Sequence, residues 1–355
     1  MPLLDRYVVR TILGAVALVM SVLLILGALF LFIDQQDDIG VGHYTTLGAL
    51  QFAALNLPQY AWELLPVGTL IGALLGLGSL ARGSELIIFR ASGISVARIA
   101  GSALIAGIVL VCLEVALGEF LAPPLQQAAR RMKAFDKYTD VNFGGNGGAW
   151  VRDGNLMLNV EQQSGERQFG GMLLFELSPD HRLRAVGHAA LATAKADKSW
   201  ALRDYAESRF ADDRVVARRS GERILSTNVT ADFLGLAVTD PWQLETGELL
   251  RVMRYYNANA LDARPYLFAF WSRIARTVAI LFTVLLAIPF VLGSLRSAGA
   301  GARALVGLLL GVGLFLLQRL IESGTVVFDL NPILLAWLPT GLLAVVSVGL
   351  LVRAR

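Results

Sequence analysis

The sequence predicts a helical membrane protein with six transmembrane helices, both termini on the inner side of the membrane, and an inserted all-β domain that is jelly-roll-like. Three observations predict this fold class. Of the 355 residues, 55% are hydrophobic and only 17% are charged, whereas soluble domains are about half apolar and about a quarter charged. Long apolar runs fill both ends of the chain. A polar middle with short alternating segments separates them.

Each expected transmembrane span is a run of roughly 20 mostly apolar residues, the length that crosses about 30 Å of hydrocarbon. The first run is too long for a signal-peptide core, so we expect it to remain as a span. The expected spans are residues 11–33, 62–81, 99–122, 266–293, 302–322 and 332–352. The chain therefore divides into residues 1–122 with three spans, an inserted domain at 123–265, and residues 266–355 with three more.

Basic residues in the short connections predict the orientation, because Lys and Arg are concentrated in cytoplasmic loops. Those on one side are Arg6, Arg10, Arg82, Arg90, Arg98, Arg296, Arg303, Arg353 and Arg355. The opposite connections, residues 34–61 and 323–331, contain neither Lys nor Arg. Both termini are therefore expected in the cytoplasm, and residues 123–265 on the outer side.

The inserted domain has the sequence texture of a β-sheet. Segments such as GGMLLFELS and WALRDYAESRF are short and partly alternating, and turn clusters such as RDGN and SPDH separate them. About eight strands are expected in a sandwich or jelly roll, the last of them at RILSTNVTADF. Two helical stalks are expected at residues 126–138 and 244–260, where this domain joins the spans, and the second of them is amphipathic.

The connector between the second and third spans, LARGSELIIFRASGISVARIA at residues 80–100, carries charge and helix signals together. Ser84 is expected to cap a helix whose first turn holds Glu85. Gly93 is expected to end that helix in the left-handed conformation, and Ser95 to cap the next one.

So short a helix is unstable alone in water, so its apolar residues Leu86, Ile87 and Phe89 need a cover. Interfacial lipid or a cytosolic partner would provide it. Membrane subunits of ATP-driven transporters present a coupling helix in this way. The alternative is a loop helix that merely lies at the membrane surface.

Several chemistries find no support in the sequence. The four lysines, Lys133, Lys137, Lys195 and Lys198, all lie in the inserted domain, so no nucleotide-binding G-x-x-x-x-G-K-[ST] loop exists. His43, His181 and His188 have no metal-ligand spacing, and Cys112 is expected to be a small core residue. Basic residues lack interleaved aromatics, so no nucleic-acid partner is expected.

Charged residues within spans are costly and need partners or a wet cavity. Glu114 and Arg276 lie deepest, and Arg319 belongs to the same group of uncertain role. Structural pairing is the favoured interpretation, and a proton relay is the alternative. Glycines at four-residue spacing, Gly68, Gly72 and Gly76 in the second span and Gly307 and Gly311 in the fifth, predict close helix packing within the chain or at a dimer face.

Four stretches resemble the lipopolysaccharide export permeases of the LptF/LptG family. They are LLDRYVVRTIL at the start, ALLGLGSLARGSELIIFRASGIS at residues 73–95, GEFLAPPLQQAARRMKA at 118–134, and LPTGLL near the end. The LDRY opening and the form GLGSLARGSEL are more similar to the LptG branch than to the LptF branch. The resemblance covers the whole chain.

This resemblance implies a non-catalytic permease subunit in the inner membrane of a Gram-negative bacterium, with its inserted domain in the periplasm. The implied partners are an LptF-like sister permease, an LptB-like ATPase dimer, LptC and a periplasmic LptA-like bridge, together with lipopolysaccharide and membrane lipid. ATP and Mg²⁺ would bind only the ATPase, and this chain would hold no cofactor or metal. The family's coupling helix corresponds to Ser84, Glu85, Leu86, Phe89, Arg90, Ser92 and Gly93.

The resemblance also implies where the lipid binds. Lipopolysaccharide carries phosphates on its sugars, and basic side chains bind phosphate well. Arg130 and Lys133 match basic positions of the family, and Arg131 adds a third cation. This chain has Asp37 and Asp38 where some members have lysines, so direct phosphate contact there would need a bridging divalent cation. The competing hypothesis is an ion-coupled secondary transporter or a membrane-anchored assembly scaffold, based on Glu114, Arg276 and the β domain.

Overall fold

The computed structural model describes residues 3–137, 141–142, 149–163, 168–180, 182–195, 199–211, 214–227, 229, 240–259, 261–293, 299–327 and 330–353. The chain forms two compact units. A helical unit comprises Met1–Asp37, Ala49–Ala129 and Arg264–Arg355. A mainly β unit comprises Asp38–Gly48 and Arg130–Ala263.

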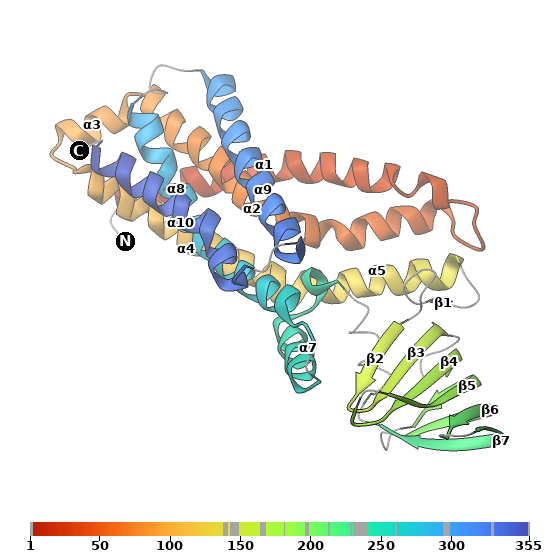
Figure 1. Ribbon diagram of the computed structural model, residues 1–355. Coiled ribbons are helices and arrows are strands. Elements are labelled where there is room, and N and C mark those ends of the chain that lie inside the picture. Colours follow the sequence, from red (N-terminus) through yellow and green to blue (C-terminus); the bar gives the residue numbers. More distant parts are fainter. Residues whose placement is uncertain are drawn as a thin grey trace. The chain divides into compact units, whose positions relative to one another are not determined.

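Six helices in the described part of the chain are long and apolar enough to cross a membrane, which confirms the expected number of spans (Figure 1). They are built on α1 (Leu3–Ile33), α2 (Thr46–Arg82), α4 (Val96–Ala116), α8 (Arg264–Leu292), α9 (Ala300–Val327) and α10 (Pro332–Arg353). The fold class is therefore an α-helical membrane protein with an inserted β domain.

The second span differs from the sequence expectation, because α2 begins at Thr46 rather than near residue 62. The first half of this helix is not a continuous apolar run, because the polar residues Asn56 and Gln59 interrupt it. Both are buried but satisfied: Asn56 donates to the Phe52 carbonyl at 2.8 Å and Gln59 donates to the Glu63 carboxylate at 2.8 Å. The expected outer loop of residues 34–61 therefore ends at residue 45.

The third span continues through a change in helical pitch. α4 passes into a π-helical segment, η2 (Leu117–Leu121), and then into α5 (Ala122–Lys137), so helix is present where the first stalk is expected. Pro123 and Pro124 lie just after the π segment, and proline cannot donate to the preceding turn. Gly118 in η2 faces Trp62 of α2 so closely that a Cβ there would lie 2.4 Å from the indole nitrogen.

The spaced glycines bring helices of one chain together, which is the first of the two kinds of packing that they predict. A Cβ on Gly72 would lie 2.5 Å from the Val16 Cα, so α2 contacts the α1 backbone directly. A Cβ on Gly311 would lie 2.7 Å from the Val67 side chain, so α9 packs on α2 by the same device. Close backbone approach of this kind is how helices associate in lipid.

The β unit contains one antiparallel sheet of seven strands among the described residues. The strands are β1 (Val141–Asn142), β2 (Ala149–Asp153), β3 (Leu156–Gln163), β4 (Gln168–Leu177), β5 (Leu183–Ala194), β6 (Ser199–Phe210) and β7 (Val215–Ser226). From β3 to β7 each strand pairs with the next in the chain, and both β1 and β2 pair with β3. Figure 1 shows β2 to β7 side by side in chain order.

The last strand corrects the sequence expectation. β7 begins at Val215, so it includes the run VVARRSGE, which precedes the expected strand RILSTNVTADF. Its first eight residues are all exposed, and this edge position explains why no buried face marks the strand in the sequence. The later part of the expected strand, residues 230–233, lies outside the described residues.

One face of the sheet carries an apolar core around Trp200, Phe169 and Leu202. The Trp200 indole donates to the Val229 carbonyl at 2.8 Å, which satisfies the one polar atom of that side chain. Helix α7 (Thr246–Ala258) packs on this core through Tyr255, whose hydroxyl accepts a hydrogen bond from the Arg152 backbone at 2.7 Å. α7 occupies the place where the second stalk helix is expected.

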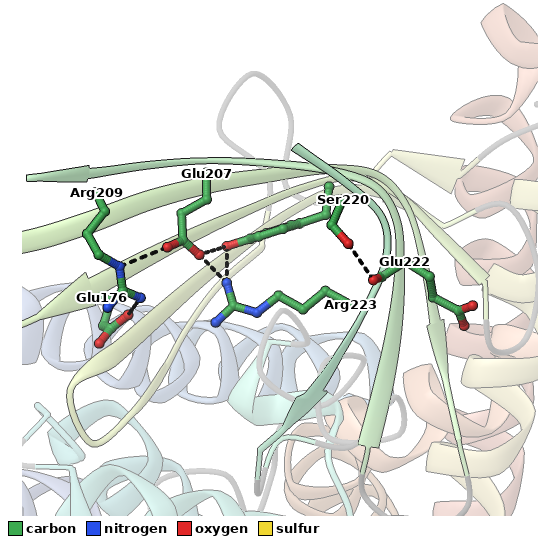
Figure 2. A network of polar contacts seen from close by, with 7 residues as sticks. Glu176, Glu207, Arg209, Ser220, Glu222 and Arg223 are labelled. Atoms are coloured by element: carbon green, nitrogen blue, oxygen red, sulfur yellow. Dashed lines mark hydrogen bonds and ion pairs between the residues drawn. The ribbon is translucent and has the colours of Figure 1, made fainter. Parts of the chain in front are cut away.

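A polar network spans β4, β6 and β7 beside this core (Figure 2). Tyr205 donates to Glu207 at 2.9 Å, and Arg209 donates to the other Glu207 oxygen at 3.0 Å. Arg223 contacts both Tyr205 and Glu207, and Arg209 reaches on to Glu176 at 3.3 Å. The buried Glu207 carboxylate is thus held by two arginines and a tyrosine.

This network shifts the pKa values of its members. Burial and the neighbouring Glu207 carboxylate raise the pKa of Tyr205 to about 12. Burial alone would raise the pKa of Glu207, but hydrogen bonds from Tyr205 and Arg209 and the charge of Arg223 outweigh it and lower that pKa below 4.5.

Candidate coupling helix and lipid-binding stalk

The connector between α2 and α4 contains a two-turn helix, α3 (Glu85–Ala91). Gly93 ends it with φ of 85°, and the backbone amides of Gly93 and Ile94 donate to Arg90 and Phe89 at 3.0 Å. This double closure is the left-handed helix ending that the sequence predicts. Ser95 then caps α4 by accepting a hydrogen bond from the Arg98 amide at 3.2 Å.

The expected role of Ser84 as a side-chain cap is wrong. Its backbone is left-handed, with φ of 60° and ψ of 7°, and its side chain makes no capping bond. A capping side chain needs an extended backbone at that position. Instead, the Ser84 carbonyl accepts from the amides of Ile87 and Ile88, and Ser84 provides the tight turn that follows α2.

The burial of α3 also differs from the expectation. Leu86 is only 3% exposed within the helical core, and Phe89 packs partly against the same core. The chain therefore covers these two residues itself. Ile87 and Ile88 remain 42% and 59% exposed, beside the exposed Arg90, so only this side of α3 still needs a cover.

Residues near the start of the chain hold this connector, and the sequence reasoning missed them. The buried Asp5 carboxylate accepts hydrogen bonds from Arg98 at 2.9 Å and from Ser102 at 2.6 Å. The Tyr7 hydroxyl, two residues further on, interacts with the Glu85 side chain. The LDRY opening was the available signal, because it places an acid and a tyrosine together in an otherwise apolar helix.

Two of the three stalk residues expected to bind lipid, Lys133 and Arg130, have partners within the β unit. The Lys133 ammonium lies 2.6 Å from the Asp38 carboxylate and 5.9 Å from the centre of the Tyr44 ring. Arg130 donates to the Gln243 side chain, and Arg131 is exposed. The structure thus brings Lys133 together with Asp38, one of the two aspartates that follow the first span.

The deep charges of the helical unit pair with one another. The Arg276 Nε lies 3.2 Å from Glu114, and its guanidinium lies 3.6 Å from the centre of the Trp62 ring. Nearby, Arg273 lies 3.8 Å from Glu119. Glu114 and Arg276 therefore form an ion pair within the chain, as the structural interpretation predicts. Arg319 is exposed on α9, 5.8 Å from the centre of the Phe315 ring.

Two further residues differ from their expected places. Arg303 was expected in a connection, but it lies within α9, is 2% exposed and packs on Gly78 of α2, where a Cβ would lie 1.9 Å from its guanidinium. Cys112 is exposed on α4 rather than buried in the core. Sequence patterns missed both because the helix face that contacts a neighbour depends on that neighbour.

The described residues contain no cluster of three or more His, Cys, Asp or Glu side chains that could hold a metal ion. His181, Lys198, Arg296, Asp329 and Arg355 lie outside the described residues. The features that remain as candidate sites are therefore the α3 connector and the α5 stalk.

Known proteins are similar to this chain over nearly its whole length. Residues 6–353 match the family described as Lipopolysaccharide export system permease LptF/LptG. The chain belongs to the LptF/LptG family. It is 33% identical to the Lipopolysaccharide export system permease protein LptG of Escherichia coli K12, over 99% of this chain and 98% of that protein. It is 29% identical to the protein of the same name from Haemophilus influenzae, over 99% of both chains. The LptF/LptG family match includes α3 and α5, so both candidate sites lie within the matched residues.

Proposed function

We propose that this chain is the LptG-like permease subunit of an ATP-driven complex that extracts lipopolysaccharide from the inner membrane. Its family is one of export permeases. The single observation that carries the coupling part is α3, a helix that the chain stabilises through Leu86 while leaving Ile87 and Ile88 exposed. An exposed apolar pair beside charged residues is suited to a groove on a partner protein.

The proposal assigns the remaining roles to partners. A sister LptF-like permease completes the membrane assembly, and an LptB-like ATPase dimer binds ATP and Mg²⁺, because this sequence has no nucleotide-binding loop. The β unit lies in the periplasm and passes lipid to LptC and an LptA-like bridge. Apolar side chains along α9, including Leu305, Leu309, Leu316 and Leu320, are exposed, as surfaces covered by lipid or a sister subunit would be.

The lipid phosphates are proposed to bind at the α5 stalk. Arg130, Arg131 and Lys133 lie within four residues of one helix, and the first two are exposed. Arginine forks and a lysine ammonium are well suited to phosphate. The competing ion-coupled hypothesis relied on Glu114 and Arg276, and their pairing with each other supports a structural role for them instead.

The function is tested by extracting the tagged chain from native membranes in mild detergent and identifying the accompanying proteins and lipids by mass spectrometry. A second six-span permease, a cytosolic ATPase and lipopolysaccharide are the expected companions. A chain that purifies alone and without lipopolysaccharide would contradict the export function.

If α3 couples ATP hydrolysis to transport, Glu85→Arg should abolish the ATP-driven transport of lipopolysaccharide while the complex still assembles. Reversing this charge changes the surface offered to the ATPase, whereas Leu86 and Gly93 still hold the helix. Lipid release and ATP hydrolysis are measured together in proteoliposomes. Glu222→Arg, an equal charge reversal at an exposed β7 position, is the control.

Because the Tyr7 hydroxyl interacts with Glu85, Tyr7→Phe is measured alongside. This variant removes the hydroxyl but keeps the Glu85 carboxylate, and it should retain most of the transport. Normal transport by Glu85→Arg would rule out the coupling role. Equal losses in both variants would make Glu85 a residue that only positions the helix.

A further inference from the structure

The ion pair between Lys133 and Asp38 is built into a shaped loop. Asp38 ends the 3₁₀ turn η1 (Gln36–Asp38), and the backbone amides of Gly40, Val41 and Tyr44 are bonded within the loop at 2.9–3.2 Å. Gly40, with φ of 92°, allows the chain to turn back there. The loop backbone therefore holds Asp38 in a defined position.

The surroundings strengthen this pair. The side chains of Lys133 and Asp38 are 24% and 25% exposed, so water screens their attraction only in part. Tyr44 of the same loop is fully buried and lies beneath the ammonium, where its ring adds a second attraction. One loop thus supplies both a negative charge and a cation-binding ring to one lysine.

Any lipid phosphate that binds Lys133 must compete with Asp38. A phosphate monoester carries a charge of about −1.5 to −2 near neutral pH, since its second pKa is about 6. A phosphodiester, the headgroup linkage of ordinary phospholipids, carries only about −1 and so matches a carboxylate. A monoester therefore attracts Lys133 more strongly than Asp38 does, whereas a diester gains little by replacing it.

We propose that Asp38 is a built-in counter-ion that makes the stalk selective for phosphate monoesters over phosphodiester lipids. This inference rests on the proposed lipid site at Lys133 and adds the residue that determines its selectivity. When a phosphate monoester binds Lys133, it replaces Asp38 as the partner of the ammonium, and Asp38 separates from α5. Ordinary membrane phospholipid leaves the Lys133–Asp38 ion pair intact.

The test measures how much lipopolysaccharide and how much phosphatidylglycerol stay bound to the complete complex purified from native membranes. In Asp38→Asn, we expect bound phosphatidylglycerol to rise and the ratio of lipopolysaccharide to phosphatidylglycerol to fall about threefold, the scale of a partly exposed ion pair. Asp37→Asn removes the same charge at the neighbouring exposed residue and should leave the ratio unchanged. Asp38→Glu keeps the charge and should largely preserve it.

Two results separate the two proposals. An unchanged ratio in Asp38→Asn, with Lys133→Gln still losing lipopolysaccharide, overturns the counter-ion role but leaves the lipid site intact. If Lys133→Gln retains all of its lipopolysaccharide, the proposed stalk site itself fails. If Asp38→Asn does not assemble while Asp38→Glu does, Asp38 is a structural requirement of the loop and the selectivity role is rejected.

Discussion

Glu114 is 1% exposed among apolar helices, so its charge must be balanced inside the chain. Arg276 lies 3.2 Å away, and Trp62 covers the guanidinium. Gly118 makes room for that indole, because any larger residue there would contact it. At the scale of the residue, a glycine, an aromatic ring and two opposite charges form one neutral cluster between α2, α4 and α8. Removing one charge leaves the other uncompensated.

We therefore expect Glu114→Gln to destabilise the protein by about 3 kcal/mol, because it leaves Arg276 buried without its carboxylate. Arg276→Gln should cost a similar amount, and the double variant should cost less than the sum of the two. Thermal unfolding in detergent measures all three. Glu119→Gln, which removes a more exposed carboxylate from a longer pair, should cost less and serves as the comparison. Strict additivity would contradict the pairing.

At the scale of the element, α3 depends on the turns at its two ends. Gly93 has a φ of 85° and open space where a Cβ would lie, so a larger residue there meets backbone strain without any clash. Gly101 in α4 has the same open space but an ordinary helical backbone. The two glycines therefore form a matched pair in which only the backbone conformation differs.

Gly93→Ala should weaken the end of α3 by about 1 kcal/mol, because a left-handed backbone disfavours a Cβ. Gly101→Ala should be neutral or slightly stabilising, since alanine favours a helix. Hydrogen exchange of the amides in residues 85–95 measures the effect in the membrane-embedded protein. Equal exchange in the two variants would show that the turn does not limit the stability of α3.

At the scale of the whole molecule, the two units are stabilised by different physics. The helical unit relies on glycine-mediated contact and internal charge pairs, whereas the β unit combines an apolar core with the Glu207 network. The pKa of Glu207 is lowered in the folded protein, so its contribution to stability is fully present above pH 4.5 and is lost as the pH falls through the folded pKa. Tyr205, with a pKa raised to about 12, contributes fully below pH 10 and is lost as the pH rises toward 12.

The β unit is accordingly expected to lose stability below pH 4.5, and Glu207→Gln should flatten that part of the profile. Tyr205→Phe should flatten the alkaline part between pH 10 and 12 in the same way. Tryptophan fluorescence follows the unfolding, because Trp200 is buried in the β core. Unchanged acid sensitivity in Glu207→Gln would assign the effect to other carboxylates.

Hydrophobic length was sufficient to predict the membrane class and the six spans, and short alternating segments between turn clusters predicted the inserted β domain. Local rules also predicted the Gly93 turn and the Ser95 cap, because both depend on residues within a few positions of each other. The connector was recognisable as a candidate site for the same reason, whereas the basic stalk was suggested by the family resemblance. Their roles in coupling and lipid binding remain predictions that the experiments above address.

Only the tertiary structure decided the partners. Asp38 meets Lys133, Asp5 meets Arg98 and Glu114 meets Arg276 across long stretches of chain, and no local pattern encodes such distances. The same holds for Arg303, which is buried because Gly78 of another helix makes room for it. The sequence by itself determined which segments enter the membrane, since that depends on composition. Which charges balance each other depends on how the helices pack, and this was decided by the fold.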